Sequence, residues 1–311
     1  MITSVFKKST LLNFSLVVIL ILFFDFIYQI QDLAWSNSAV LVFKKTAIGV
    51  VVLFSGLITN FVSKRNGLSK DSGYSMLFFL LLLLFFPTLY DNINLVFANF
   101  FILLALRRLI SLQSQKASKE KIFDASLWIL VASLFHFWCI IFLVLVFISI
   151  ISHVSGDYRN WLLPFIAFFT VVILFAIYSL AFGADAINYI KNGVEINLSI
   201  DYFTNNYQNA ALSVYATVAL FFLISTVMTL SSKPLLLHAS FKKIIIAFLI
   251  AVVIYAISAN KSNDLLVFTI APLAIMATSH IEMPQQKLNQ ELALGVLILC
   301  SLFAFFSQII V

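Results

Sequence analysis

The residues of this chain that could do chemistry are mainly a few carboxylates in or beside long apolar segments. Asp25 lies inside the segment 11–29, and Asp32 follows it by seven residues, so two helical turns would place both side chains on one face. Because burying an ionisable residue in such a segment is costly, these residues are functional candidates. A carboxylate here could act as a general base or hold a cation, and we predict Asp32 and Asp25 as the catalytic residues. In the structural alternative, Asp25 pairs with a neighbour and Asp32 is solvated.

Two short turns contain further polar candidates. The sequence "FPTLYDNIN" contains Asp91 and Asn92, and either residue could bind a substrate or cap the helix that follows. The sequence "SANKSND" contains Lys261 and Asp264, which could form a salt bridge within the turn. In the alternative interpretation, Lys261 contacts a phosphate group of the substrate. We predict these four residues as substrate-binding residues.

The motifs of soluble enzymes are absent from the sequence. It contains no Walker loop, no G-x-G-x-x-G, no H-E-x-x-H and no C-x-x-C. The four histidines show no ligand spacing, and the two cysteines, Cys139 and Cys300, lie in apolar runs without a partner at a suitable distance in the sequence. We therefore expect no metal site and no cofactor.

The composition indicates a membrane protein. Of the 311 residues, 62% are hydrophobic and 10% are charged, and the mean hydropathy is +1.07, whereas about a quarter of the residues of a soluble domain are charged. The chain is long enough for about eleven helical spans of about 20 residues each, which leaves no room for a separate soluble domain. We predict an all-α polytopic membrane protein with a single domain, residues 1–311. The net charge of +6 comes mostly from short loops, so it indicates membrane topology and not nucleic-acid binding.

Apolar segments bounded by polar residues predict eleven spans. They are 11–29, 46–61, 74–89, 95–112, 122–134, 138–151, 161–182, 210–230, 244–259, 265–278 and 292–311. The region 122–151 could also form one tilted helix. With two helices and a cytoplasmic N-terminus, 15 positive residues lie in the cytoplasm and 4 outside, against 12 and 7 for one helix. The positive-inside rule therefore favours eleven spans with the C-terminus on the outer side.

Two of the predicted loops are long. The outer segment 183–209 contains Asp185, Glu195 and Asp201, and its apolar residues are spaced as in a short interfacial helix, although a solvated loop is the simpler interpretation. The inner segment 107–121 contains five positive residues against Glu120. We expect this inner segment to lie against anionic lipid head groups.

From residue 61 to 164 the order of features is similar to that of a known superfamily. A basic turn "FVSKRNGLSKD" precedes a helix that ends in "FFPTLYDNINLVF", and a helix closing on "LLALRRL" precedes the pair "FDASLWILVASLFHFWCIIFLVLVFISI" and then "WLLPFIAFF". This order resembles the core of the polyprenol-phosphate-dependent membrane glycosyltransferases of the GT-C superfamily, with Asp91 and Arg107 at matching places. The sequence "SNDLLVFTIAPLAIMAT" also resembles a helix of these enzymes, with Pro272 at their second proline. The chain is further similar to uncharacterised inner-membrane proteins of Bacteroidota.

The resemblance implies a GT-C-like core at about 46–182, an outer loop at 183–209 and C-terminal helices at 210–311. The enzymes of the superfamily carry a catalytic acidic residue in a long first outer loop. Here only "IQDLAWSNSAVLVFKK" joins the first two spans, and Asp32 is its only carboxylate. Glycosyl transfer needs a base near the acceptor and positive groups near the donor phosphate, roles for which Asp32 and Lys44 or Lys45 are available. Because this loop is too short to enclose a substrate in the same way, a scaffold that has lost catalysis is an alternative.

These observations lead to two functional hypotheses for a multi-pass protein of the bacterial inner membrane. In the first, the chain handles a polyprenol-linked sugar or another lipid-linked substrate at the outer leaflet, and any enzymatic activity is that of a polyprenol-phosphate-sugar-dependent glycosyltransferase. In the second, it is a non-enzymatic subunit or scaffold of an envelope secretion or assembly complex. A small secondary transporter ranks third, because the sequence shows no repeated halves.

Overall fold

The computed structural model describes residues 2–183, 186–198, 205–259, 261–284 and 286–309, which are mostly helical. Within these ranges there are α-helices and short 3₁₀ helices but no β-strand, and one isolated bridge joins Ile196 to Ser258. The predicted all-α class is therefore confirmed for the described part of the chain.

The α-helices follow one another along the whole chain. They are α1 (Ile2–Phe6), α2 (Leu11–Gln29), α3 (Ala39–Arg65), α4 (Tyr74–Leu83), α5 (Ile93–Ser111), α6 (Ser118–Ser133), α7 (Leu143–His153), α8 (Arg159–Phe182), α9 (Ala186–Val194), α10 (Asn206–Met228), α11 (Leu235–Ile257), α12 (Val267–Ile281) and α13 (Lys287–Ile309). The 3₁₀ helices are η1 (Leu33–Asn37), η2 (Pro87–Asp91), η3 (Leu112–Ser114), η4 (Phe137–Phe142), η5 (Leu230–Ser232) and η6 (Asn263–Leu266).

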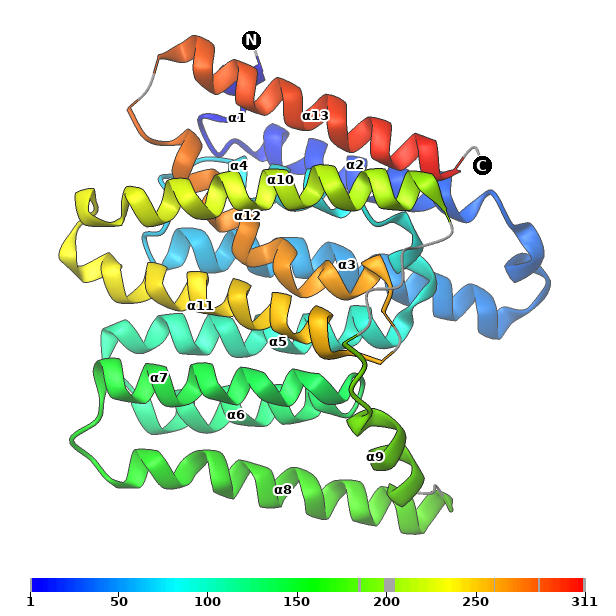
Figure 1. Cartoon of the computed structure of the whole chain (residues 1–311), viewed down its shortest axis with the longest axis vertical. Coiled ribbons are helices and arrows are strands. Elements are labelled where there is room, and N and C mark those ends of the chain that lie inside the picture. The colour runs from blue at the N-terminus through cyan, green and yellow to red at the C-terminus, as the bar shows by residue number, and fades with distance from the viewer. Residues whose placement is uncertain (1, 184–185, 199–204, 260, 285, 310–311) are drawn as a thin grey trace.

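The long helices run side by side, and their turns gather at two ends of the bundle (Figure 1). The α3–α4, α5–α6, α7–α8, α10–α11 and α12–α13 turns lie at one end, which we call the basic end. The α2–α3, α4–α5, α6–α7 and α11–α12 turns lie at the other, which we call the carboxylate end, together with α9. α8 forms one edge of the bundle, where it packs against α6 and α7.

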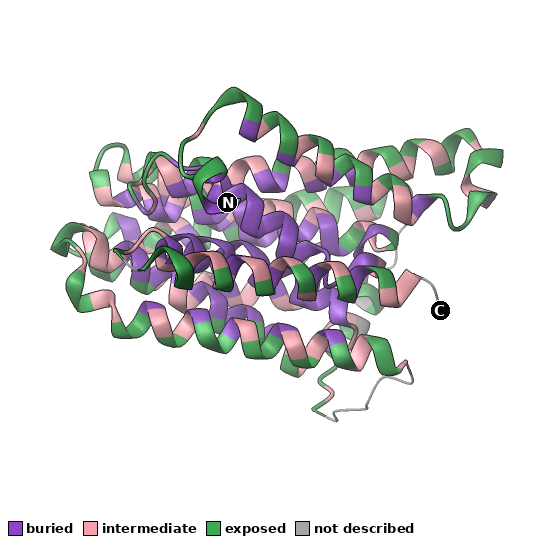
Figure 2. Ribbon diagram, turned by 90° about the horizontal axis from the view of Figure 1, so that it is seen from above, coloured by how far each residue is buried: buried purple, intermediate pink, exposed green. Residues whose placement is uncertain are grey.

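Two apolar helices form the centre of the bundle. Every residue of α4 is buried, as is every residue of α12 except His280, and the two helices pack against each other. A helix that is apolar on all sides is expected in a core, and Figure 2 shows the buried residues in the middle of the bundle. α4 ends at Leu83, earlier than the predicted segment 74–89, because Pro87 disfavours a helical conformation at Phe86, whose φ is −131° and ψ is 66°.

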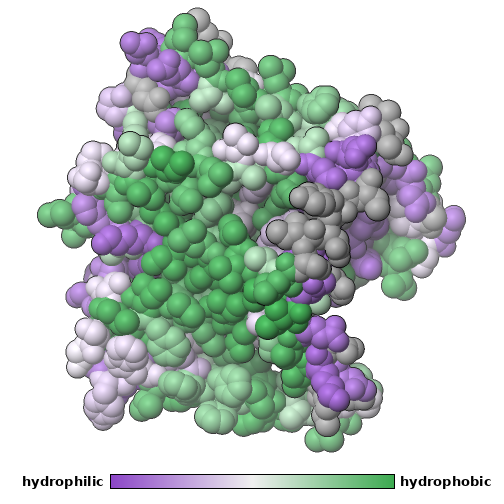
Figure 3. Space-filling model, viewed as in Figure 1, coloured by the Kyte–Doolittle hydropathy of each residue, from purple (hydrophilic) through white to green (hydrophobic). Residues whose placement is uncertain are grey.

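The outer helices turn large apolar side chains away from the bundle. Examples on α8 are Leu180 and Phe182, which are 86% and 75% exposed. Figure 3 shows hydrophobic residues across the middle of one face and hydrophilic residues toward the helix ends. Among the described residues, eight helical segments are long and apolar enough to cross a membrane. They are Leu11–Gln29, Ala39–Arg65, Ile93–Ser114, Arg159–Phe182, Asn206–Met228, Leu235–Ile257, Asn263–Ile281 and Lys287–Ile309. Exposed apolar surface of this extent suits lipid and not water, so the chain is a multi-pass membrane protein.

The region 122–151 consists of two helices and not one. α6 ends at Ser133, and His136 has an extended conformation with φ −143° and ψ 107° before η4 and α7 begin. The prediction of two short helices is therefore confirmed. α4, α6 and α7 are shorter than the eight candidate spans.

Candidate functional site at the carboxylate end

Asp91 joins three segments at the carboxylate end. It is the last residue of η2, and the Tyr28 hydroxyl of α2 donates a hydrogen bond to its Oδ2 at 2.5 Å. Lys45 Nζ of α3 forms a salt bridge with Oδ1 of the same carboxylate. The Lys45 side chain is 20% exposed and that of Asp91 is 57% exposed, so the ion pair lies at the surface, with its carboxylate accessible to a ligand.

Asp25 lies one turn before Tyr28 on α2 and is partly buried against α3. Its Oδ1 accepts a hydrogen bond from Gln29 Nε2 at 3.1 Å. A Cβ added to Gly49 would lie 2.3 Å from Asp25 Oδ2, so the absence of a side chain at Gly49 makes room for the carboxylate. The positive charge of Lys45 also acts on Asp25.

Asp264 provides a third carboxylate, from the α11–α12 turn. It is buried in η6 and accepts a hydrogen bond from Thr88 Oγ1 of η2 at 2.5 Å. The charges of Asp264 and Asp91 act on each other and on Tyr28. We call Asp25, Asp91 and Asp264, with Lys45 and Tyr28, the carboxylate cluster.

A cavity of about 340 Å³ lies at the carboxylate end, and two of its lining residues are sequence neighbours of cluster carboxylates. The start of α5, the α6–η4 turn, α9 and the α11–α12 turn form its walls. Its lining residues are Asn92, Asn94, Leu95, Phe135, His136, Phe137, Trp138, Tyr189, Gly193, Glu195, Ser258, Ala259, Ser262 and Leu265. Asn92 and Leu265 directly follow Asp91 and Asp264 in the sequence. We call this space the aromatic cavity, and its volume lies within the range of about 300 to 1,000 Å³ that is usual for small-molecule sites.

Neutral hydrogen-bonding groups line the aromatic cavity. His136 Nε2 lies 3.2 Å from Ser258 Oγ, and Ser258 Oγ donates to the Ile254 carbonyl at 2.7 Å. Ser258 Oγ therefore accepts a hydrogen bond from His136 Nε2–H, which assigns this tautomer and leaves Nδ1 as an acceptor. Burial lowers the pKa of His136 to about 4, so the ring is neutral at pH 7. The buried Trp138 Nε1–H has no partner among the described residues and can donate to a ligand.

α9 covers one side of the aromatic cavity. The Tyr189 hydroxyl donates to the Leu134 carbonyl, and a Cβ added to Gly193 would lie 2.9 Å from Phe137 Cβ. After α9, the backbone N–H of Asn197 donates to the Ile257 carbonyl at 3.2 Å. The segment 183–209 therefore contains a short helix, as in the second of its two interpretations and not the simpler one, while Asp185 and Asp201 lie outside the described residues.

The structure brings together four of the predicted site residues, namely Asp25, Lys45, Asp91 and Asp264. Asn92 lines the aromatic cavity and also caps α5, because its side chain accepts from Leu95 N at 3.4 Å. Lys44 precedes Lys45 on α3 and so points about 100° away around the helix. Lys261 donates to the Asn197 carbonyl, which connects the α11–α12 turn to the segment after α9.

Asp32 does not share a helix face with Asp25, contrary to the prediction. α2 ends at Gln29, whose carbonyl accepts a hydrogen bond from Trp35 Nε1 at 2.9 Å. Asp32 is exposed in the turn after α2, and the corner between α2 and α3 projects from the bundle (Figure 1). Among the described residues, the structure contains no group of three His, Cys, Asp or Glu side chains arranged to hold a metal ion.

His136, Trp138 and Glu195 also line the aromatic cavity, although they are not among the predicted site residues. The available signal was the run "FHFW" at the predicted break between two apolar helices. His136 and Trp138 are aromatic residues with polar atoms. At a break between two helices such residues lie at the end of the bundle and not in its core. The contribution of Glu195 depends on the path of the chain after α9, which no local sequence pattern determines.

The neutral state of His136 predicts how stability depends on pH. Its pKa is about 4 in the folded protein and 6.5 when exposed, so the unfolded state binds more protons between these values. Stability is full above pH 6.5 and falls as the pH drops toward 4. We expect the free energy of unfolding to fall by up to about 3 kcal/mol over this range relative to a His136→Gln variant. The melting temperatures of both proteins in detergent at pH 7.5 and pH 4.5 measure the difference. An equal drop in melting temperature for the two proteins would contradict the prediction.

Comparisons with known proteins bear on the family and not on the chemistry. Neither the curated proteins nor the solved structures contain a match to this chain. All of the chain, residues 1–311, matches the family described as "Family of unknown function (DUF6427)". This helical membrane protein, with its carboxylate cluster and aromatic cavity, is therefore a member of the DUF6427 family.

Proposed function

We propose that this protein binds the sugar, or a similar hydroxyl-rich head group, of a lipid-linked substrate at the carboxylate end. The observation that carries the proposal is the aromatic cavity next to the carboxylate cluster. Sugar hydroxyls donate to carboxylates in strong charge-assisted hydrogen bonds. The apolar faces of a sugar pack against aromatic rings such as those of Trp138 and Tyr189, and Trp138 Nε1–H can donate to a hydroxyl.

The lipid part of the proposed substrate would lie against the apolar sides of the helices, which begin close to the cavity. In the proposal the carboxylate end faces the outer side of the bacterial inner membrane. The distribution of positive residues supports this orientation, because 15 of the 19 belong to the basic end. All eleven helices would then span the membrane, with α4, α6 and α7 as short spans, and the resemblance to GT-C enzymes belongs to the same proposal.

A glycosyl transfer at this site would use residues other than Asp32. Asp264 is the buried carboxylate nearest in sequence to the cavity wall, and within the described part of the chain its hydrogen-bond partners are the hydroxyl groups of Thr88 and Ser262. It is the better candidate for a general base, because Asp91 is already bound by Lys45 and Tyr28. Lys45 is the cation of the cluster, and in the proposal it exchanges the Asp91 carboxylate for a phosphate oxygen of the donor.

A binding experiment tests the proposed function. Three probes are compared: a polyprenyl phosphate that carries one sugar, the same polyprenyl phosphate without a sugar, and the free sugar. We expect the first probe to raise the melting temperature of the purified protein most. The variant Trp138→Phe removes one hydrogen-bond donor and should weaken binding by about fivefold to tenfold, which corresponds to about 1 kcal/mol.

The matched control is Trp35→Phe, because the indole N–H of Trp35 is bound to the Gln29 carbonyl and Trp35 does not line the cavity. This variant should bind the sugar-carrying probe as the unmodified protein does. Equal stabilisation by the bare polyprenyl phosphate, together with unchanged binding by Trp138→Phe, would contradict the proposal.

The proposed orientation predicts which turns are accessible from outside the cell. Asn37 in η1 and Gln286 before α13 are exposed residues at opposite ends of the bundle. In a variant without Cys139 and Cys300, a membrane-impermeant maleimide should label Asn37→Cys in intact cells. It should label Gln286→Cys only after the cells are permeabilised. The reverse pattern would place the carboxylate end in the cytoplasm and overturn the proposed orientation.

A further inference from the structure

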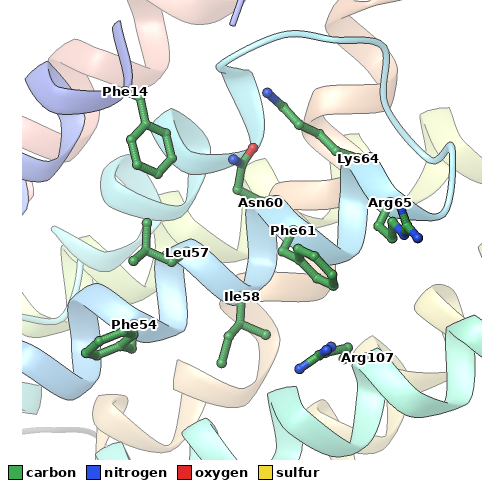
Figure 4. A pocket seen from close by; sticks show the side chains of 9 residues that line it. All are labelled: Phe14, Phe54, Leu57, Ile58, Asn60, Phe61, Lys64, Arg65 and Arg107. Atoms are coloured by element: carbon green, nitrogen blue, oxygen red, sulfur yellow. The ribbon is translucent and has the colours of Figure 1, made fainter. Parts of the chain in front are cut away.

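A groove lies at the basic end, where α3 faces α2 on one side and α5 on the other. It consists of two joined cavities of about 640 and 780 Å³, and both are lined by Phe61, Arg65 and Arg107. The first cavity continues along α3 past Ile58 and Leu57 to Phe54 (Figure 4). The second opens toward the α5–α6 turn. The groove is therefore apolar at one end and basic at the other.

The two arginines shared by both cavities are free to bind an anion. The described salt bridges of this region use their neighbours, since Arg108 pairs with Asp124 at 2.8 Å and Lys64 with Asp71 at 3.1 Å. Arg65 and Arg107 form no salt bridge among the described residues. The Arg107 guanidinium lies 4.8 Å from the centre of the Phe61 ring, which holds it at the mouth of the apolar part.

The apolar part of the groove offers an apolar lining to the first part of an acyl chain. From Phe61 to Phe54 the helix advances about 10 Å, at about 1.5 Å per residue. Phe54 and Phe61 are 50% and 44% exposed, so their rings are available to a ligand. Figure 4 shows Phe54 at one end of this cavity and Arg65 and Arg107 at the other.

A buried amide provides an independent sign of a ligand. Asn60 lines the first cavity and is only 8% exposed, and its Oδ1 has no hydrogen-bond partner among the described residues. A buried acceptor without a partner is unfavourable, and a hydroxyl donor in the groove would satisfy it. The glycerol hydroxyls of a phospholipid head group are donors of this kind.

From these features we infer that the groove binds an anionic phospholipid of the leaflet at the basic end. The phosphate lies between Arg65 and Arg107, since the guanidinium fork suits phosphate oxygens. One acyl chain lies along Ile58, Leu57 and Phe54. This site is separate from the aromatic cavity at the other end of the bundle. The inference therefore does not depend on the proposed function.

Lipid titration of the delipidated protein in detergent tests this inference. Phosphatidylglycerol should raise the melting temperature, whereas phosphatidylethanolamine and inorganic phosphate should have little effect. The double variant Arg65→Gln/Arg107→Gln should bind phosphatidylglycerol at least tenfold more weakly. The double variant Lys7→Gln/Lys8→Gln loses the same charge at the same end but outside the groove, and it should bind normally.

Two further variants separate a binding defect from a folding defect. Arg107→Lys keeps the charge but loses the guanidinium fork, so it should give intermediate affinity. Ile58→Trp fills the apolar part and should weaken lipid binding with both arginines in place. If the arginine and lysine double variants lost the same affinity for phosphatidylglycerol, the inference would be overturned. The lipid would then be attracted by basic charge in general and not by the groove. Equal stabilisation by inorganic phosphate alone would overturn it as well, because the site would then bind an anion and not a lipid.

Discussion

Replacing Asp91 with asparagine is expected to abolish the function of the protein in its own cell. The carboxylate of Asp91 binds both Lys45 and Tyr28, and the next residue, Asn92, lines the aromatic cavity, whereas an amide cannot neutralise the lysine. In a strain that lacks the chromosomal gene, the Asp91→Asn protein should restore less than a tenth of the growth or envelope-glycan phenotype. Because an exposed ion pair contributes only about 0 to 1 kcal/mol, the melting temperature should change little.

The matched control for Asp91 is Asp71→Asn. Asp71 also pairs with a lysine, Lys64, but at the basic end, so this variant should restore the phenotype fully. The exchanged pair Lys45→Asp/Asp91→Lys distinguishes a structural role from a chemical one. If the exchanged pair restored function, Asp91 would serve only to hold α3 against η2, and the proposed site would lose its central carboxylate.

The second large effect is expected at Gly49, where α3 packs against the Asp25 carboxylate. A Cβ at this position would lie 2.3 Å from Asp25 Oδ2, so Gly49→Ala must displace the carboxylate from Gln29. Overpacking of this kind typically costs about 1 to 3 kcal/mol, which outweighs the roughly 1 kcal/mol that alanine gains over glycine in a helix. Thermal melting in detergent should show a clear loss of stability.

Gly295 provides the control for Gly49, because it also lies inside a helix but has open space around its Cα. Gly295→Ala should be neutral or stabilising by up to about 1 kcal/mol. The double variant Gly49→Ala/Asp25→Ala should recover most of the loss, because the clashing carboxylate is gone. If the double variant lost as much stability as the two single variants together, Asp25 would not pack over Gly49.

The sequence predicts most of the helices because each one needs a continuous apolar segment. All eleven predicted segments contain a helix of the structure, including the separate α6 and α7. The boundaries are less accurate where polar residues lie inside a helix. α3 begins at Ala39 and not at residue 46, because Lys44 and Lys45 in its second turn make the start of the helix appear polar.

The composition of the candidate site could be predicted only in part. Asp25, Asp91 and Asp264 stand out as carboxylates next to apolar segments, but their association depends on contacts between α2, α3, η2 and η6. Lys45 and Asp91 are 46 residues apart in the sequence, and no local pattern specifies such a pair. Helical periodicity places Asp32 on the same face as Asp25 only if the helix continues past Gln29, where α2 in fact ends.

The charges of the two ends favour different ligands. The carboxylate cluster, with three carboxylates and one lysine, suits hydroxyl donors, whereas the groove at the basic end, with Arg65 and Arg107, suits a phosphate. The exposed apolar surface between the two ends suits the membrane interior. These features fit the two proposals made above, a lipid held at the basic end and a hydroxyl-rich head group bound at the carboxylate end.

The most direct test of the proposed function is an electron cryomicroscopy map of the protein purified from its native membrane in a mild detergent. We predict density for a head group in the aromatic cavity, in contact with Trp138 Nε1 and within hydrogen-bonding distance of His136 Nδ1. A tail should extend from it along the apolar sides of the helices. An empty cavity in a map that resolves both of these side chains would contradict the proposed function.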